Sequence, residues 1–318
     1  MCGFLAEYNI VSQKELDKGG FLEILNLSYN RGPDSQGYYS VQNKVQMGFN
    51  RLAIIDTSLA GQQPMISPNK KFTIVFNGEI YNHLDLRKKL PFNSYRGHSD
   101  TETITVCLEI WGIEKTVKAL NGMFAMVIFN HDSEEFSLVR DFAGIKPLFY
   151  GWDGKTVVAA SQYDQIMKHS LFSKKSINPQ VLKLYLQQHF LPAPFGLHED
   201  TFQVLPGEIV TFNNKGHKTN LRYWELPVTQ EEYISNYNEA ESYIEMILDN
   251  CVKNQLLSDV PLGAFLSGGV DSSLIGSAIK KYHDKAQVFT IGSDSKVHDE
   301  SQRAKQFADA LELQQTIR

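Results

Sequence analysis

Hydrophobic and polar positions in the first half of the chain form short runs that turn residues separate. Each run has the length and composition that are typical of a β-strand. The runs are KFTIVF (71–76), GMFAMVIF (122–129), FSLVRD (136–141), PLFY (147–150) and TVVAAS (156–161). Asn77-Gly78 follows the first run, and NHDSEE and GWDGK join the later ones. We therefore predict antiparallel strands that are joined in hairpins.

Helical spacing of apolar positions interrupts these strands. It occurs in KELDKGGFLEILNLSYN (14–30) and in TETITVCLEIW (101–111). A proline-bearing stretch at 190–210 then leads into RYWELP (222–227). This mixture of strands and helices predicts a layered α+β domain with antiparallel sheets between helices.

The chain changes character where the polar segment TQEEYISNYNE precedes a predicted helix at 240–257. We place the domain boundary between Leu226 and Asn238. This placement gives a first domain at residues 1–226 and a second at residues 238–318.

The second domain alternates strands and helices. LGAFLS (262–267) is an apolar run of the kind that parallel sheets bury on both faces, and QVFTIG (287–292) is a second such run. A helix begins at the serines after the first run, and another at 299–313 has four apolar residues on one face. This order is the start of a doubly wound parallel sheet, and two strands leave the sheet incomplete.

Composition narrows the class of protein. The 318 residues, 42% hydrophobic and 21% charged, indicate a globular protein large enough for two domains. A net charge of -5 without basic runs argues against nucleic-acid partners and anionic membranes. The sequence shows no membrane-spanning stretch and no secretory signal, so we expect a cytoplasmic location.

The three cysteines are an odd number, which argues against a disulfide framework and fits a reducing compartment. Cys107 and Cys251 fall on apolar stretches and are predicted to be buried core thiols. Cys2 directly follows Met1, and removal of Met1 would leave one residue with both a thiol and a free α-amine. Such an amine can take the proton of the thiol, although a terminal cysteine can also be inert.

Two further motifs have both a chemical and a structural interpretation. In FNGEIYNH (76–83), the Asn77 amide and the Gly78 N–H could form an oxyanion hole, or the pair could be a hairpin turn. Arg51 could bind a carboxylate and Asp100 an ammonium, so that together they would recognise an amino acid. A surface arginine and a helix N-cap aspartate are the structural alternatives.

The strongest local motif is FLSGGVDSS (265–273), in which a predicted strand ends in two glycines before a helix. Backbone N–H groups and hydroxyls at such a helix N-terminus bind phosphate, and Asp271 could hold Mg²⁺ against phosphate oxygens. The lysine of a Walker A loop is absent. A tight turn that serves packing alone is the alternative.

These motifs occur in an order that resembles one family. The order is CGF, RGPD, RLAIID, FNGEIYN, SDTE, GMFAMVIF, GIKPLFY, LPGE and LSGGVDSS. It closely resembles glutamine-dependent asparagine synthetases over nearly all of the chain. The first half looks like a class II glutamine amidotransferase domain of the N-terminal-nucleophile hydrolase fold. The last part looks like the start of an ATP pyrophosphatase (PP-loop) domain.

The resemblance implies a role for particular residues. Cys2 would attack the side-chain amide of glutamine, with Asn77 and Gly78 as the oxyanion hole. Arg51 would bind the α-carboxylate of glutamine, and Asp100 would bind its α-amine. The glutamine-binding positions as a whole are Arg51, Leu52, Ala53, Ile54, Ile55, Asn77, Gly78, Glu79 and Asp100.

In the second domain the resemblance implies ATP and a carboxylate acceptor. The matching ATP positions are Leu266, Ser267, Gly268, Gly269, Asp271, Ser272 and Ile291, with Mg²⁺ on Asp271. ATP would adenylate aspartate, and ammonia from glutamine would displace AMP to give asparagine. An enzyme that amidates another carboxylate in surface-sugar or natural-product biosynthesis, and a non-catalytic relative, are the alternatives. A homodimer stays an open alternative.

The sequence departs from the family pattern in two motifs. Asn30 stands where the family has histidine, and Phe142 and Ala143 stand where it has arginine and phenylalanine. Family members also continue well beyond residue 318. We therefore expect the chain to be part of a longer enzyme and unable to complete the ATP step by itself.

Overall fold

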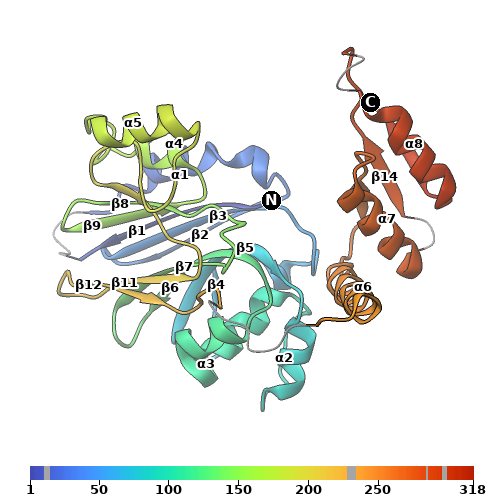
Figure 1. Cartoon of the computed structure of the whole chain (residues 1–318). Coiled ribbons are helices and arrows are strands. Elements are labelled where there is room, and N and C mark those ends of the chain that lie inside the picture. The colour runs from blue at the N-terminus through green and yellow to red at the C-terminus, as the bar shows by residue number, and fades with distance from the viewer. Residues whose placement is uncertain (11–14, 228–233, 284–285, 296–298) are drawn as a thin grey trace. The chain divides into compact units, whose positions relative to one another are not determined.

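The computed structural model describes residues 1–10, 15–227, 234–283, 286–295 and 299–318. The chain divides into two compact units, Met1–Leu226 and Pro227–Arg318. Each unit is described by itself below (Figure 1).

Among the described residues of the first unit, twelve strands form its centre. They are β1 (Gly3–Asn9), β2 (Ser35–Val41), β3 (Val45–Arg51), β4 (Met65–Ile66), β5 (Phe72–Ile80), β6 (Gly122–Asn130), β7 (Glu135–Arg140), β8 (Phe149–Trp152), β9 (Thr156–Ala160), β10 (Thr201–Gln203), β11 (Glu208–Phe212) and β12 (Lys218–Arg222). One six-stranded sheet has the order β10-β8-β9-β1-β3-β2, and the other has the order β12-β11-β7-β6-β5-β4. Neighbouring strands are antiparallel in both sheets.

Large apolar side chains fill the space between the two sheets. They come from alternate strand positions, because successive side chains in a strand point to opposite faces. Tyr8 of β1 stacks on Phe136 of β7 with ring centroids 5.3 Å apart, and both side chains are fully buried. Other members of this core are Phe4, Met47, Phe49, Val75, Val127, Phe129, Leu138 and Phe212. Burial of these side chains stabilises the face-to-face packing of the sheets.

Helices cover the outer faces of the sheets (Figure 1). They are α1 (Lys18–Asn26), α2 (His83–Lys89), α3 (Asp100–Ala119), α4 (Tyr163–Lys168) and α5 (Pro179–Gln188). Phe21 of α1 and Ile166 of α4 pack with Leu5 on the first sheet. Leu86 of α2 and Ile104 of α3 pack on the second sheet. The predicted fold class of antiparallel sheets layered between helices is confirmed.

Two helices differ in length from the prediction. α1 begins at Lys18, because the Asp17 side chain accepts a hydrogen bond from the Gly20 N–H (3.0 Å) and caps the helix. The predicted start at residue 14 lies outside the described residues. α3 continues to Ala119 through a kink at Gly112, where a φ of 76° favours glycine.

Asn77 and Gly78 lie inside β5 and not in a turn. They pair with Ala125 and Phe124 of β6. A Cβ atom on Gly78 would lie 2.3 Å from the Met123 carbonyl oxygen, so the close approach of β6 requires glycine. The hairpin interpretation of this pair is therefore wrong, because the ladder with β6 continues through it.

The second unit is a parallel sheet with helices. Its strands are β13 (Gly263–Phe265), β14 (Gln287–Thr290) and β15 (Gln314–Ile317), and its helices are α6 (Tyr237–Asn254), α7 (Val270–Tyr282) and α8 (Ser301–Ala310). Ala304 and Ala308 of α8 are buried in one core with Val288, and Phe307 and Leu311 pack against it, as predicted. The parallel arrangement is also confirmed, and α6 begins and ends slightly earlier than predicted.

Three predictions for the second unit are wrong. β15 is a third strand where two were predicted, because its sequence QQTI has no apolar run. Phe265 is 76% exposed while Leu266 is buried, so the LGAFLS run is not buried on both faces. Cys251 is exposed, since α6 buries Val252 instead, whereas Cys107 is buried as predicted. In the described part of the chain, no helix is long and apolar enough to cross a membrane.

Candidate active site

Cys2 lies immediately before β1, and the first sheet places it beside the end of β3. Gly3 pairs with Asn50, so Cys2 adjoins the loop that follows Arg51. The Leu52 N–H donates to Cys2 Sγ (3.3 Å), and Sγ lies 3.5 Å from the Leu52 carbonyl oxygen. Backbone groups of one residue therefore hold the thiol in place.

Two opposing effects act on the thiol of Cys2. Burial raises its pKa because the thiolate would lose solvent, and the Leu52 N–H and the terminal amine act in the opposite direction. The pKa remains above its ordinary value. The thiol is therefore protonated at rest, and a base must remove its proton before the sulfur can attack.

The α-amine of the chain lies at the same end of the site, on Met1. Burial lowers its pKa, and the positive charges of Lys146 and Arg31 add to this effect. An amine at this end of the chain therefore loses its proton more readily than one in water. Arg31 also fixes the local backbone, because its Nε donates to the Cys2 carbonyl oxygen (3.1 Å).

A small pocket opens beside Cys2. Its lining residues are Cys2, Arg51, Leu52, Ile54, Ile55, Gly61, Gln63, Phe76, Gly78, Glu79, Asp100 and Thr101. Most residues predicted to bind glutamine thus meet in one place, although they come from β3, β5, α3 and the loops between them. Asn77 and Ala53 are adjacent to this lining, and the Ala53 N–H donates to the Asp34 carboxylate (2.8 Å).

Arg51 is buried at the end of β3 and is not a surface arginine. Its Nη1 donates to the Ser58 carbonyl oxygen (2.8 Å), and its Nη2 donates to the carbonyl oxygen of Asp56. The side chain therefore holds the loop that curves around it. A guanidinium has five N–H donors, so further donors remain for a substrate carboxylate.

Asp100 is the first residue of α3 and is buried, so the N-cap interpretation is wrong. Ser99 is the N-cap instead, and its side chain accepts from the Glu102 N–H (3.2 Å). Asp100 accepts from the Ile80 N–H (2.9 Å), which ties it to β5. Burial raises the pKa of Asp100 and of Glu79, and the charge of Asp100 raises that of Glu79 further. The pocket thus contains two carboxyl groups that can pair with a cationic group.

Asn77 is 1% exposed, and its Nδ2 has no hydrogen-bond partner among the described residues. A buried amide donor without a partner is costly, and such groups are often found where a ligand supplies the missing acceptor. Asn77 follows Phe76, a residue of the pocket lining. The orphaned donor is consistent with a role in binding an oxyanion.

Sequence reasoning missed two buried residues near the thiol. Lys146 is 5% exposed, and burial lowers its pKa while Glu79 and Cys2 oppose that change. Gln63 joins the loop after β3 to β5, because its side chain both accepts from the Phe76 N–H (2.6 Å) and donates to the Phe76 carbonyl (3.1 Å). Lys146 lies in the quoted GIKPLFY motif, but a single lysine in a sequence indicates a surface residue.

The glycine-rich loop of the second unit joins β13 to α7. Gly268 has a φ of 78°, and a Cβ there would lie 2.7 Å from the Ala304 backbone nitrogen. α7 begins at Val270, before the predicted serines, with Gly269 as an N-cap that supplies no side-chain hydrogen bond. Ser267 and Ser272 face each other across the loop with their hydroxyls 3.1 Å apart. Within the residues that the structure describes, the N-terminus of α7 has no side-chain cap.

The remaining ATP-site positions are distributed around this loop. Leu266 is buried in the core, whereas Ile291 directly follows β14 and is 76% exposed. Asp271 is an exposed residue in the first turn of α7. In the described part of the chain there is no group of three or more His, Cys, Asp or Glu that could bind a metal ion. The loop thus fits a phosphate, and one carboxylate fits Mg²⁺ that phosphate oxygens also bind.

Comparison with known proteins places the chain in a family. The chain belongs to the glutamine amidotransferase domain family, whose model matches residues 1–224, and residues 244–318 match the asparagine synthase model. The predicted resemblance is thereby confirmed.

Its relatives include asparagine synthetase [glutamine-hydrolyzing] 1 of Bacillus subtilis, 32% identical over 99% of this chain and 49% of that protein. A putative asparagine synthetase [glutamine-hydrolyzing] 2 of Methanocaldococcus jannaschii is 34% identical over 90% of this chain and 58% of that protein. The chain therefore spans about half the length of the curated relatives it matches. A solved glutamine phosphoribosylpyrophosphate amidotransferase from Bacillus subtilis aligns over 99% of this chain and 65% of its own, with a TM-score of 0.49 and 17% identity.

Proposed function

We propose that the first unit hydrolyses glutamine at Cys2. The observation that carries this proposal is one pocket that contains a thiol, a guanidinium and two carboxyl groups. These groups complement glutamine: Arg51 faces its α-carboxylate, Asp100 and Glu79 face its α-ammonium, and Cys2 faces its side-chain amide. A neutral or singly charged substrate would leave one of these buried groups uncompensated.

The proposed reaction begins once Met1 has been removed. The α-amine of Cys2 takes the thiol proton, and the sulfur attacks the amide carbon of glutamine. Asn77 Nδ2 and the Gly78 N–H stabilise the negative oxygen that forms. The ammonium of Cys2 returns its proton to the departing nitrogen, so ammonia leaves and a γ-glutamyl thioester remains. Water then attacks the thioester carbon, which releases glutamate and restores the thiol.

For the whole protein we propose synthesis of asparagine from aspartate in the cytoplasm. The asparagine synthase match at residues 244–318 supports this proposal, and the three free cysteines fit a reducing compartment. Ser267, Gly268, Gly269 and Ser272 would hold the phosphates of ATP, with Mg²⁺ on Asp271. ATP would supply activation of the acceptor carboxylate, to which ammonia is then added.

Two assays test this function. We expect the 318-residue chain to convert glutamine to glutamate and ammonia without ATP. We expect the protein that carries this chain to release pyrophosphate when ATP, glutamine and aspartate are all present. No glutamate release would refute the glutaminase proposal, whereas pyrophosphate release only with another carboxylic acid would reassign the acceptor.

Glutamine binding is expected to depend on pH through Glu79. Burial, with Asp100 beside it, raises the pKa of Glu79 to about 8. Below that pH the carboxyl group is protonated and no longer attracts the ammonium of glutamine. The KM for glutamine should therefore fall as pH rises through about 8, and Glu79→Gln should flatten this dependence. A KM that is constant over this range would contradict the assigned role of Glu79.

The same group should act on stability in the absence of substrate. The folded-state pKa of Glu79 lies above its ordinary value of 4.5, so the folded chain binds more protons than the unfolded chain between these values. Its contribution to the free energy of unfolding therefore falls as pH rises from 4.5 to about 8. Glu79→Gln should remove this fall, which denaturant unfolding at several pH values would show.

A further inference from the structure

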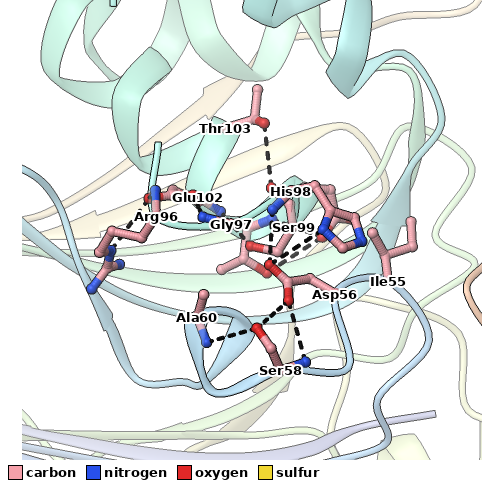
Figure 2. A network of polar contacts seen from close by, with 12 residues as sticks. Ile55, Asp56, Ser58, Ala60, Arg96, Gly97, His98, Ser99, Glu102 and Thr103 are labelled. Carbon is pink, nitrogen blue, oxygen red and sulfur yellow. Dashed lines mark hydrogen bonds and ion pairs between the residues drawn. The ribbon is translucent and has the colours of Figure 1, made fainter. Parts of the chain in front are cut away.

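Two sequence motifs that are distant along the chain meet at one carboxylate. RLAIID (51–56) supplies the loop after β3, and GHSDTE (97–102) leads into α3. We call these two segments the first wall and the second wall. The first wall contains Arg51 and the second wall contains Asp100, the two charged groups that are proposed to bind the ends of glutamine. Figure 2 shows the side chain of Asp56, the last residue of the first segment, in contact with His98 of the second.

The Asp56 carboxylate bridges the two segments by hydrogen bonds. One oxygen accepts from the Ser58 hydroxyl (2.5 Å) and the Ser58 N–H (3.2 Å), and the other accepts from the His98 N–H (2.8 Å). Asp56 is 1% exposed. Burial disfavours the charge, but these hydrogen bonds outweigh it and lower the pKa of Asp56. The imidazole of His98 also lies nearby, with its Nδ1 3.9 Å from the Asp56 oxygen that accepts from the His98 N–H.

The backbone of Asp56 is tied to the first wall as well. Its carbonyl oxygen accepts from Arg51 Nη2, and Arg51 Nη1 donates to the Ser58 carbonyl (2.8 Å). Asp56 has a φ of 55°, in the left-handed region that aspartate and asparagine tolerate better than most residues. One residue thus contacts the guanidinium of Arg51 through its backbone and His98 through its side chain.

Hydrogen bonds from Arg87 and to Glu102 hold the second wall on the side away from Asp56. Arg87 donates to the carbonyl oxygens of Gly97 and Ser99 (both 2.8 Å), and Glu102 accepts from the Gly97 N–H (3.1 Å). A Cβ on Gly97 would lie 2.0 Å from Asp56 Oδ2. The segment therefore approaches the Asp56 carboxylate as closely as a glycine permits.

We propose that Asp56 is a positioning residue that sets the separation between Arg51 and Asp100. It does not touch the substrate, and it is absent from the lining of the pocket. Because Asp56 joins the two walls, it holds Arg51 and Asp100 at the separation that the α-carboxylate and the α-ammonium of one amino acid require. This role rests on the proposed function of the pocket, and the bridge between the walls is testable without substrate.

Two substitutions disturb the bridge from opposite sides. Asp56→Asn tolerates the same backbone conformation, but its NH₂ group would face an N–H donor of either Ser58 or His98. Gly97→Ala keeps the carboxylate and pushes the second wall away from it. Asp85→Asn, at an exposed carboxylate, and Gly19→Ala, whose Cβ would meet only an ordinary contact at 3.5 Å, are the matched controls.

We expect both bridge variants to raise the KM for glutamine at least about tenfold while kcat falls by less than about threefold. Alkylation of Cys2 by iodoacetamide, which needs no amino-acid pocket, should stay within about twofold of the unsubstituted chain. The double variant should show less than the sum of the two effects, because both disturb one contact. The controls should match the unsubstituted chain, and thermal unfolding shows that each variant is folded.

Hydrogen exchange separates this proposal from the proposed function. Without substrate, Asp56→Asn should speed the exchange of amides at residues 97–101 and in the loop after Arg51, while the controls should not. If the unsubstituted chain fails to hydrolyse glutamine, the proposed function is refuted, and this exchange result still decides whether Asp56 joins the walls. Unchanged exchange, or an unchanged KM in an active variant, would overturn the role of Asp56.

Discussion

Cys2→Ala is expected to reduce glutamine hydrolysis by about 10⁴-fold or more. The reason is that the thiol is the proposed site of the covalent intermediate, and in the described part of the chain no other cysteine lines the pocket. Glutamate release by the purified chain measures the effect. Cys251→Ala is the matched control, because this thiol is exposed and lies in the other unit. The control should retain full activity.

Covalent labelling gives this prediction a second readout. A diazoketone analogue of glutamine should attach to Cys2 in the unsubstituted chain and leave Cys107 and Cys251 unmodified. Mass spectrometry of the labelled chain should also show that Met1 has been removed, since the amine of Cys2 is the proposed base. A label on another residue, or full activity with Met1 retained, would contradict the mechanism. In the whole protein, Cys2→Ala should leave synthesis from added ammonia intact.

Sequence patterns predicted the layered fold because its strands bury large side chains at regular intervals. β6 and β7 have a hydrophobic core on each face of their sheet. Their residues therefore form continuous apolar runs, which are easily recognised in the sequence. β15 was not predicted, because it lacks such an apolar run. Its mostly polar residues form a strand by parallel pairing with β14. Phe265 was predicted to be buried because it lies in an apolar run. Its exposure, however, depends on which elements pack against its face of the sheet.

The candidate site also depends on contacts between residues that are distant in the sequence. Whether Asn77-Gly78 forms a turn depends on the register of β5 against β6, which the dipeptide itself does not specify. Arg51 is buried because the following loop curves back over its guanidinium. Asp56 lay in a recognised motif without a role, because its partner His98 is distant in the sequence. Motif order identified these segments, but only the fold shows which of them touch.

Asn77→Ala is expected to lower kcat for glutamine hydrolysis by about 10²- to 10³-fold and to change KM little. The unpartnered Nδ2 of Asn77 is proposed to donate to the oxygen of the amide only as that oxygen becomes negative. An interaction that strengthens in the transition state affects kcat more than substrate binding. Initial rates of glutamate release over a range of glutamine concentrations would separate the two constants.

Two comparisons distinguish this role from a structural one. Asn69→Ala, at an asparagine that is hydrogen-bonded to Glu109 and absent from the pocket lining, should leave both constants unchanged. Asn77→Asp keeps the shape of the side chain but places a carboxylate where negative charge develops, so kcat should fall at least as far as in Asn77→Ala. Recovery of kcat in Asn77→Asp would instead assign the amide a purely structural role. A raised KM with unchanged kcat in Asn77→Ala would assign this amide to substrate binding, because its hydrogen bond would then be made equally in the ground state.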